Sequence, residues 1–265
     1  MRIGKTILQE KIRWFHERFV SGKLPSKLGI YFHELHENQF DSIRQFIEYF
    51  RKEGYRFTGD PLEFVESEGE LIVFLSLDDN FQSTFDLLEL ADELDVKFAV
   101  YLNTLYFRDR DDHQVRSQYR SNLRNDVDCE LLGQSEVREI AKRGHSIGAH
   151  SHSHLQLSAL PQAEAELEIR RCKEELELLV DGPVQHFSYP FGMRRHFNES
   201  LREYCRNIGF ATVANAIPGM QHCQQQRYAI QRTGWMLDES LERNLANLCI
   251  DGRIYERLTG RSAVI

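Results

Sequence analysis

The sequence predicts an α/β fold, a distorted (β/α) barrel of about seven parallel strands in a single domain. Short apolar runs typical of buried strands alternate with segments in which apolar residues recur every three or four positions. The 265 residues suffice for one large α/β domain, and 41% hydrophobic with 28% charged residues is a globular composition. Strands that alternate with helices pair in parallel, and about seven such units favour a barrel over an open sheet.

Seven apolar segments are expected to form the strands. In chain order they are residues 28–32, 71–77, 96–102, 145–149, 184–188, 210–214 and 228–231. The clearest helical patterns between them lie at residues 40–50 and 85–94. Residues 106–132, rich in Arg and Asp, follow the third strand without clear periodicity, and we expect a charged loop at the mouth of the barrel.

The first 27 residues predict a basic amphipathic helix ahead of a barrel domain that spans residues 28–265. They hold seven Lys or Arg residues against two Glu, with apolar residues on a broad helical face. Such a helix could make peripheral contact with an anionic membrane surface. We favour the alternative that it packs on the domain itself or on a second subunit; the sequence does not indicate the oligomeric state.

Composition excludes several other classes of protein. Lys and Arg number 33 against 41 Asp and Glu, and the resulting net charge of −8 argues against a nucleic acid partner. No apolar run reaches the length of a membrane span, and no signal peptide precedes the domain, so we expect a cytoplasmic protein. The five cysteines are widely spaced without a CxxC pair, which indicates reduced thiols.

In barrels of this kind, functional residues lie at the carboxyl ends of the strands. This rule selects polar and aromatic residues at or just beyond the predicted strand ends. They are His33, Asp78, Asp79, His150, Tyr189 and Phe191.

Two clusters among these residues predict a metal site. Asp78 and Asp79 end a buried strand, where adjacent carboxylates are unfavourable unless a cation compensates them. One of them could instead cap the next helix, although a cap needs only one acid. His150, His152 and His154 lie within five residues, and neutral imidazoles with one carboxylate are typical ligands of a catalytic metal ion. Spacing alone does not decide which histidines bind.

These motifs resemble those of the polysaccharide deacetylases, also called carbohydrate esterase family 4. The segment 76–80, SLDDN, is similar to the family's T-F-D-D-G motif, and 150–154, HSHSH, matches H-[ST]-x-x-H. The segment 187–192, FSYPFG, resembles the third motif, R-x-P-[YF]-G. The resemblance runs from about residue 28 to about residue 236.

The resemblance implies a role for each matching residue. Asp79, His150 and His154 would hold a divalent metal ion, for which zinc is expected, with cobalt, nickel and iron also compatible. Asp78 would be the general base, and the backbone N–H of Phe191 would help to form the oxyanion hole. The implied reaction is hydrolysis of the N-acetyl group of an amino sugar in a glycan or glycan precursor.

The general acid is expected on the first strand. Many family members use a histidine in a C-terminal L-x-H motif, which this sequence lacks. Circularly permuted relatives, the poly-N-acetylglucosamine deacetylases, have the His strand first, and residues 29–34, GIYFHE, resemble it. A histidine of near-neutral pKa suits proton donation, which makes His33 the predicted general acid and His36 the second candidate.

Two departures from the family motifs affect the expected chemistry. Asn80 replaces the glycine of the first motif, and asparagine can still adopt a positive φ. Ser188 replaces the arginine of the third motif, which in the family pairs with the base. Arg232, at the end of the last predicted strand, could supply this charge, but it could equally be a surface arginine.

Two alternative functions remain open at this stage. The same residues could hydrolyse an O-acetyl ester or an amide outside carbohydrates. A non-catalytic glycan-binding protein could also keep the fold, although retention of Asp78 argues against it because metal binding alone needs no second acid.

Overall fold

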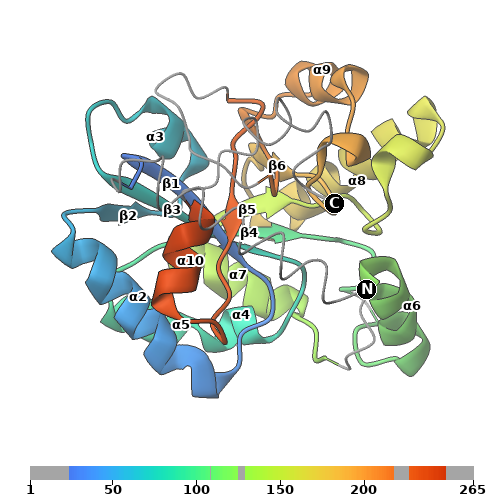
Figure 1. The fold of residues 1–265 in the computed structure, drawn as a ribbon. Helices are drawn as coiled ribbons and strands as arrows, with labels where there is room; N and C mark the ends of the chain where they lie inside the picture. Colours follow the sequence, from blue (N-terminus) through green and yellow to red (C-terminus); the bar gives the residue numbers. More distant parts are fainter. Residues whose placement is uncertain (1–23, 108, 125–128, 218–226, 249–265) are drawn as a thin grey trace, which may run out of the picture.

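The computed structural model describes residues 24–107, 109–124, 129–217 and 227–248. The predicted N-terminal helix lies outside these residues apart from its last four positions. A parallel sheet occupies the centre of the molecule, and helices pack around it (Figure 1). The prediction of a single-domain α/β barrel is confirmed.

The strands lie side by side in the order β7-β6-β5-β4-β3-β1-β8, and β2 pairs with β3. All the paired strands are parallel. Their bounds are β1 Lys27–Phe32, β2 Arg56–Thr58, β3 Ile72–Asp78, β4 Ala99–Leu102, β5 Ser146–Ala149, β6 His186–Ser188, β7 Thr212–Ala214 and β8 Thr233–Gly234.

Residues 230–232, just before β8, link the two ends of this strand order and are called the closing segment below. Ile230 forms a parallel bridge with Ala214 of β7, whereas Thr233 pairs with Ile30 of β1. The chain therefore crosses from one edge strand to the other within a few residues and closes the barrel at this point. The strand predicted at 228–231 is wrong in its bounds, because only Ile230 makes a bridge and the paired residues follow it.

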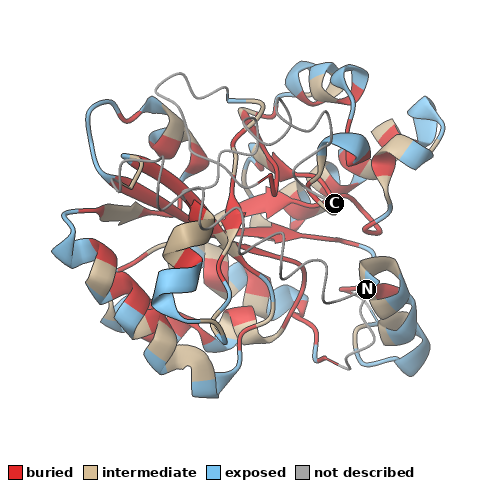
Figure 2. Ribbon diagram, in the orientation of Figure 1, coloured by how far each residue is buried: buried red, intermediate tan, exposed pale blue. Residues whose placement is uncertain are grey.

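Helices cover the outside of the barrel. Their bounds are α2 Phe40–Lys52, α3 Pro61–Glu66, α4 Ser83–Asp86, α5 Leu88–Glu93, α6 His113–Leu123, α7 Gln134–Lys142, α8 Gln162–Val180, α9 Glu199–Asn207 and α10 Leu241–Leu248, with short 3-10 helices η1 Glu37–Gln39, η2 Leu157–Ala159 and η3 Arg194–His196. Figure 2 shows the buried residues on the strands and on the sheet-facing sides of the helices.

Alternation along β3 decides which residues enter the barrel. Ile72 and Phe74 belong to a small apolar cluster inside the barrel, whereas Val73, Leu75 and Leu77 pack in the larger core beneath the helices. Side chains alternate between the two faces of a strand. Ser76 and Asp78 therefore continue the inward series, and Asp78 reaches the mouth of the barrel from inside.

Two glycines make room inside the barrel. A Cβ at Gly29 would lie 2.3 Å from the carbonyl oxygen of Gln231, and one at Gly148 would lie 2.5 Å from the ring of Tyr101. Side chains at these positions of β1 and β5 would displace the closing segment or the tyrosine. The space admits Arg232, whose guanidinium carbon lies 5.0 Å from the centre of the Tyr101 ring.

The prediction of a loop at residues 106–132 was wrong, because the segment contains α6. Asp112 caps this helix, its carboxylate accepting hydrogen bonds from the N–H groups of Gln114 and Val115. Only Tyr119 on α6 is fully buried, so the helix lacks the repeated apolar positions that reveal a helix in a sequence.

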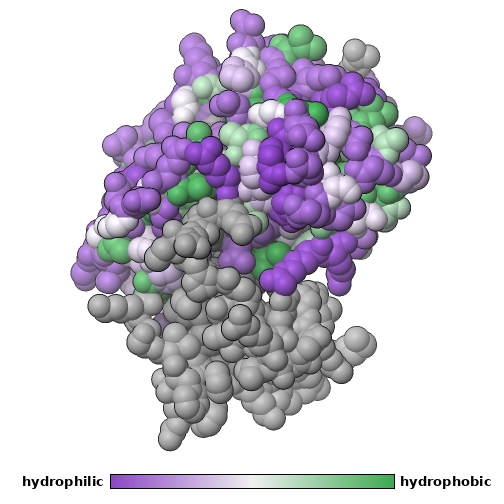
Figure 3. All heavy atoms as spheres, turned by 90° about the horizontal axis from the view of Figure 1, so that it is seen from above, coloured by the Kyte–Doolittle hydropathy of each residue, from purple (hydrophilic) through white to green (hydrophobic). Residues whose placement is uncertain are grey.

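The part of the surface that Figure 3 shows in colour is mainly hydrophilic, with small, separate hydrophobic areas. Among the described residues, no helix is both long and apolar enough to cross a membrane.

Candidate active site

Asp79, His150 and His154 meet at the carboxyl ends of β3 and β5. One potential ligand atom from each lies within 4.8 Å of the other two. The Nε2 atoms of His150 and His154 lie 3.7 and 3.4 Å from Oδ1 of Asp79. The three side chains are almost fully buried. This arrangement brings together the three predicted metal ligands.

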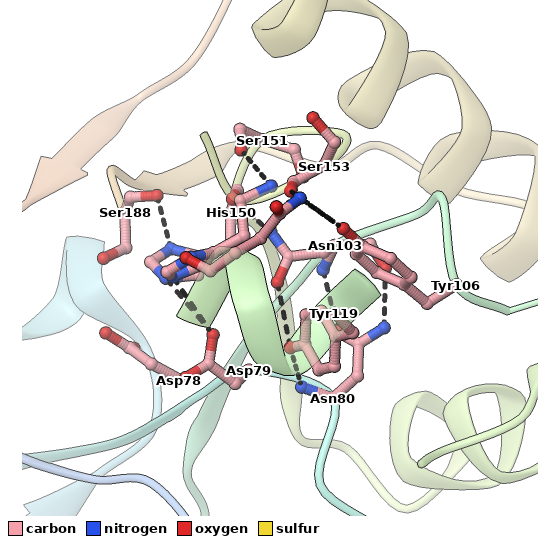
Figure 4. A network of polar contacts seen from close by, with 12 residues as sticks. Asp78, Asp79, Asn80, Asn103, Tyr106, Tyr119, His150, Ser151, Ser153 and Ser188 are labelled. Atoms are coloured by element: carbon pink, nitrogen blue, oxygen red, sulfur yellow. Dashed lines mark hydrogen bonds and ion pairs between the residues drawn. The ribbon is translucent and has the colours of Figure 1, made fainter. Parts of the chain in front are cut away.

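Hydrogen bonds at Nδ1 turn both imidazoles toward Asp79. Nδ1 of His150 lies 2.7 Å from the carbonyl oxygen of Ser188 (Figure 4). Nδ1 of His154 lies 3.3 Å from the carbonyl oxygen of Asn122. A carbonyl oxygen only accepts, so each Nδ1 carries the proton and each Nε2 keeps a free lone pair. Such support from a backbone carbonyl is typical of metal-binding histidines.

His152, between the two ligands, points elsewhere. Its Nδ1 lies 2.8 Å from Oγ1 of Thr104 and 3.1 Å from a carboxylate oxygen of Glu175. The i, i+4 pair of histidines, and not the central one, forms the site.

The chemistry of these groups fits a divalent cation. Oδ1 of Asp79 is buried without a hydrogen-bond partner among the described residues. Burial, together with the neighbouring charge of Asp78, raises the pKa of Asp79 well above its usual range. Burial also lowers the pKa of His150 to about 4, which keeps its imidazole neutral. A buried carboxylate facing two neutral imidazoles is stabilised by a metal ion.

Arg232 lies directly against Asp78. Its Nη1 and Nη2 donate to the two carboxylate oxygens at 2.7 and 2.8 Å, and the same nitrogens donate to the hydroxyl groups of Ser76 and Ser188. Nε donates to the carbonyl oxygen of Asn215. Arg232 is 1% exposed, so it is not the surface arginine that the sequence left open. It contacts Ser188, the residue that replaces the motif arginine.

This ion pair fixes the protonation state of Asp78. Burial alone would raise the pKa of Asp78, but the positive charge and hydrogen bonds of Arg232 outweigh it and hold the pKa at about 2. The carboxylate is therefore ionised at neutral pH. Because its basicity is low, it can accept a proton readily only from water that is itself acidified.

An open cavity of about 320 Å3 joins the predicted residues. His33, Asp78, Asp79, His150, His154 and Phe191 all line it. His36 does not, which favours His33 over the second candidate. His33 is exposed to the cavity, and its partial burial lowers its pKa below the ordinary 6.5, against the opposing charge of Asp78.

Four residues of the site have positive φ angles. These are Asp79 at 77°, Ser151 at 66°, His154 at 57° and Phe191 at 63°. Non-glycine residues rarely adopt this conformation, and they concentrate at functional sites. Among the described residues, no carbonyl accepts a hydrogen bond from the Phe191 N–H. This group therefore stays free to bind an oxyanion.

Asn80 does not use the positive φ that is open to asparagine; the preceding residue, Asp79, has the positive φ. Asn80 instead acts through its amide: Nδ2 donates to the carbonyl of Asn103, and Oδ1 accepts from the Asn103 N–H. An asparagine can make this two-way contact and a glycine cannot.

Three polar residues outside the motifs support the site, and Figure 4 labels two of them, Asn103 and Tyr119. Asn103 donates to the carbonyl oxygens of His150 and Ser151. The Tyr119 hydroxyl donates to Asn103 Oδ1 and accepts from the N–H of Asn80. The third, Asn122, orients His154. Tyr119 and Asn122 lie on α6, and only the capping residue Asp112 signalled that helix in the sequence.

Replacing Tyr119 by phenylalanine is expected to weaken metal binding about tenfold, because supporting hydrogen bonds hold the ligand loops in place. Zinc affinity of the wild type and the variant, measured by competition with a chromophoric chelator, checks this. The control is Tyr228→Phe, at a half-buried tyrosine whose hydroxyl donates to the carbonyl oxygen of Phe210 and contacts no residue of the site. Equal affinities in all three proteins would contradict a supporting role for α6.

The geometry defines a class: a parallel barrel with an Asp-His-His centre beside an arginine-paired carboxylate. The model of the polysaccharide deacetylase family matches residues 66–213, more than half of the sequence. The chain therefore belongs to the polysaccharide deacetylase family, as the motifs indicated.

Known proteins agree with this assignment. The putative polysaccharide deacetylase YxkH of Bacillus subtilis is 26% identical over 101 residues, which are 38% of this chain and 35% of that protein. The match thus spans about a third of this relative's length.

Solved structures share the fold at low identity. The Streptococcus pyogenes deacetylase PplD, in complex with acetate, is 16% identical with a TM-score of 0.65, covering 84% of this chain and 99% of that one. IcaB from Ammonifex degensii has 13% identity and a TM-score of 0.64, covering 85% and 98%. The BpsB deacetylase domain from Bordetella bronchiseptica is 13% identical with a TM-score of 0.63, covering 80% of this chain and 97% of that one.

Proposed function

We propose that the protein is a metal-dependent carbohydrate deacetylase that hydrolyses the N-acetyl group of an amino sugar. One observation carries this proposal: the buried Asp79, His150 and His154 donors and the ionised Asp78 open on the same cavity. Membership of the polysaccharide deacetylase family and the names of the structural neighbours support the choice of an acetylated carbohydrate.

Asp79, His150 and His154 would hold the metal ion, and zinc suits two imidazoles and one carboxylate. A bound divalent cation would supply acidified water and would polarise the acetyl carbonyl. Because the two ring Nε2 atoms and Asp79 Oδ1 already converge, little rearrangement is needed to bind it.

Asp78 accepts the proton of the attacking water in this proposal. Arg232 donates a hydrogen bond to each of its two oxygens, but each carboxylate oxygen keeps a second lone pair that can accept from the cavity. The guanidinium also fixes the plane of the carboxylate, so the base is oriented before substrate binds.

Phe191 and His33 complete the reaction. The Phe191 N–H donates a hydrogen bond to the negative charge that develops on the acetyl carbonyl oxygen. The left-handed conformation of Phe191 turns that N–H away from regular backbone pairing. His33 donates its proton to the departing amine, which leaves as the free amino sugar together with acetate. Its lowered pKa makes the protonated imidazole a stronger acid.

Metal removal is the experiment that tests the proposed function. Acetate release from N-acetylated and O-acetylated sugars should occur with the zinc-loaded protein and fall to background after dialysis against a chelator. Zinc should restore it, and cobalt, nickel and iron can be compared in the same assay. Release only from O-acetylated sugars would replace the amidase assignment with an esterase. Release that persists without metal would contradict metal dependence, and no release from any sugar would contradict the deacetylase.

A further inference from the structure

Two arginines lie beside the candidate site and have no part in the chemistry proposed for it. Arg124 follows Leu123, a residue of the cavity wall, at the end of α6. Arg195 lies in η3, just after the Phe191 turn. Both side chains belong to exposed residues.

Arg124 packs on the face of Phe191. Its guanidinium carbon lies 4.4 Å from the centre of the Phe191 ring, which itself lies 4.9 Å from the ring of His154. Nη2 of Arg124 donates to Oε1 of Gln156 at 3.3 Å. A single aromatic ring therefore separates this positive charge from a candidate metal ligand.

Arg195 contacts His196, the ring that packs against Phe191. Its Nε is 3.0 Å from Nε2 of His196, whose ring centre lies 5.3 Å from that of Phe191. Its backbone carbonyl accepts a hydrogen bond from the hydroxyl of Ser158 at 2.6 Å.

The segment that follows His154 joins the two arginines. Gln156 contacts Arg124 through Oε1, and its Nε2 lies 3.3 Å from Oγ of Ser158, which in turn bonds to the Arg195 carbonyl. Three separate segments of the chain thus hold two positive charges around Phe191 and His196.

Neither charge is neutralised within the described part of the chain. Arginines elsewhere pair with carboxylates, such as Arg44 with Glu93, Arg143 with Glu139 and Arg170 with Glu174. No carboxylate of a described residue lies within ion-pair distance of Arg124 or Arg195. Burial first, and then the charges of Arg195 and Arg124, lower the pKa of His196, which agrees with the position of both charges near this ring.

We propose that Arg124 and Arg195 bind an anionic group, phosphate or carboxylate, carried by the same sugar whose acetyl group enters the cavity. Guanidinium groups bind both anions with paired hydrogen bonds. An excess of local positive charge on a chain of net charge −8 then selects acidic substrates over neutral ones. This inference rests on the proposed deacetylase function and specifies its substrate class.

Substrate preference tests this inference. Acetate release is measured from N-acetylglucosamine, its 1-phosphate and 6-phosphate, and N-acetylmuramic acid, which carries a carboxylate. The wild type should favour at least one anionic sugar, and Arg124→Ala or Arg195→Ala should each reduce the ratio of kcat/KM for that sugar to kcat/KM for the neutral one about tenfold, through KM. Arg124→Lys should retain part of the preference, and the distant Arg170→Ala all of it. The phosphate and muramic acid arms identify which anion is bound.

Binding of the same sugars, measured by calorimetry with the zinc-loaded protein, separates this inference from the proposed function. If no sugar is hydrolysed but an anionic sugar binds more tightly than the neutral one, and the two alanine variants lose that difference, the anion site stands and the deacetylase assignment falls. If neutral and anionic sugars are bound and hydrolysed equally, or if the variants keep the wild-type preference, the anion site is refuted whatever the activity.

Discussion

Asp78→Asn is expected to lower the kcat for acetate release by about 100-fold or more, while the protein still binds zinc. The amide cannot accept a proton from water, but it leaves Asp79, His150 and His154 in place. The measurement is steady-state acetate release from the best N-acetyl sugar, together with the zinc content of the purified variant.

The buried Arg232 loses its counter-charge in this variant, so reduced folding must be separated from reduced catalysis. Thermal unfolding and zinc stoichiometry provide that check, and Asp86→Asn, an exposed acid outside the cavity, is the matched control. A folded, zinc-loaded Asp78→Asn protein with wild-type kcat would show that another group accepts the proton.

Arg232→Met is expected to lower the free energy of unfolding by about 3 to 5 kcal/mol, because it leaves the buried carboxylate of Asp78 without a partner. The guanidinium is fully enclosed, and each of its three nitrogens donates a hydrogen bond, so water cannot replace it. Urea unfolding at about pH 7, with Arg170→Met as a surface control, measures the difference.

The stability that the Asp78–Arg232 pair contributes should fall as the pH is lowered. The pKa of Asp78 is lowered from 3.8 to about 2, so the pair stabilises the wild type fully above about pH 4, and this contribution is lost as the pH falls toward about 2. In Arg232→Met the buried carboxyl should become protonated at a higher pH, and the loss of stability should shrink on acidification.

The double variant Asp78→Asn, Arg232→Met removes both charges. It should be more stable at neutral pH than Arg232→Met alone, because no unpaired buried charge remains. Equal stability of Arg232→Met and the double variant would show that the unpaired carboxylate of Asp78 is not what destabilises Arg232→Met.

The positions of the main site residues could be predicted because they follow from strand ends. A buried apolar run that stops at Asp78 and Asp79, and a second that stops at His150, place polar groups at one edge of a parallel barrel. The family motifs then distinguished His154 from His152, which spacing alone left open. The contact of His152 with Thr104 and Glu175 agrees with that distinction.

The contacts that the sequence left open, and the residues that it did not identify, depend on long-range packing. Asp78 and Arg232 are 154 positions apart, and only the closure of the barrel brings them together. Tyr119 and Asn122 reach the site from α6, whose polar sequence lacks helical periodicity. The zinc preference, the cytoplasmic location and a role of residues 1–27 at a membrane remain predictions.

Because Arg232 lies in the closing segment, Asp78 gains its counter-charge only late in translation. A nascent chain that has emerged only through β7 holds the candidate metal ligands and Asp78, but it would have to bury the carboxylate of Asp78 without the guanidinium of Arg232. The opposite charge arrives with residues 230–234, which also join the two edges of the barrel. Completion of the fold and ionisation of the candidate base are thus one event, and we expect an incomplete product of translation to be inactive and poorly folded for the same reason.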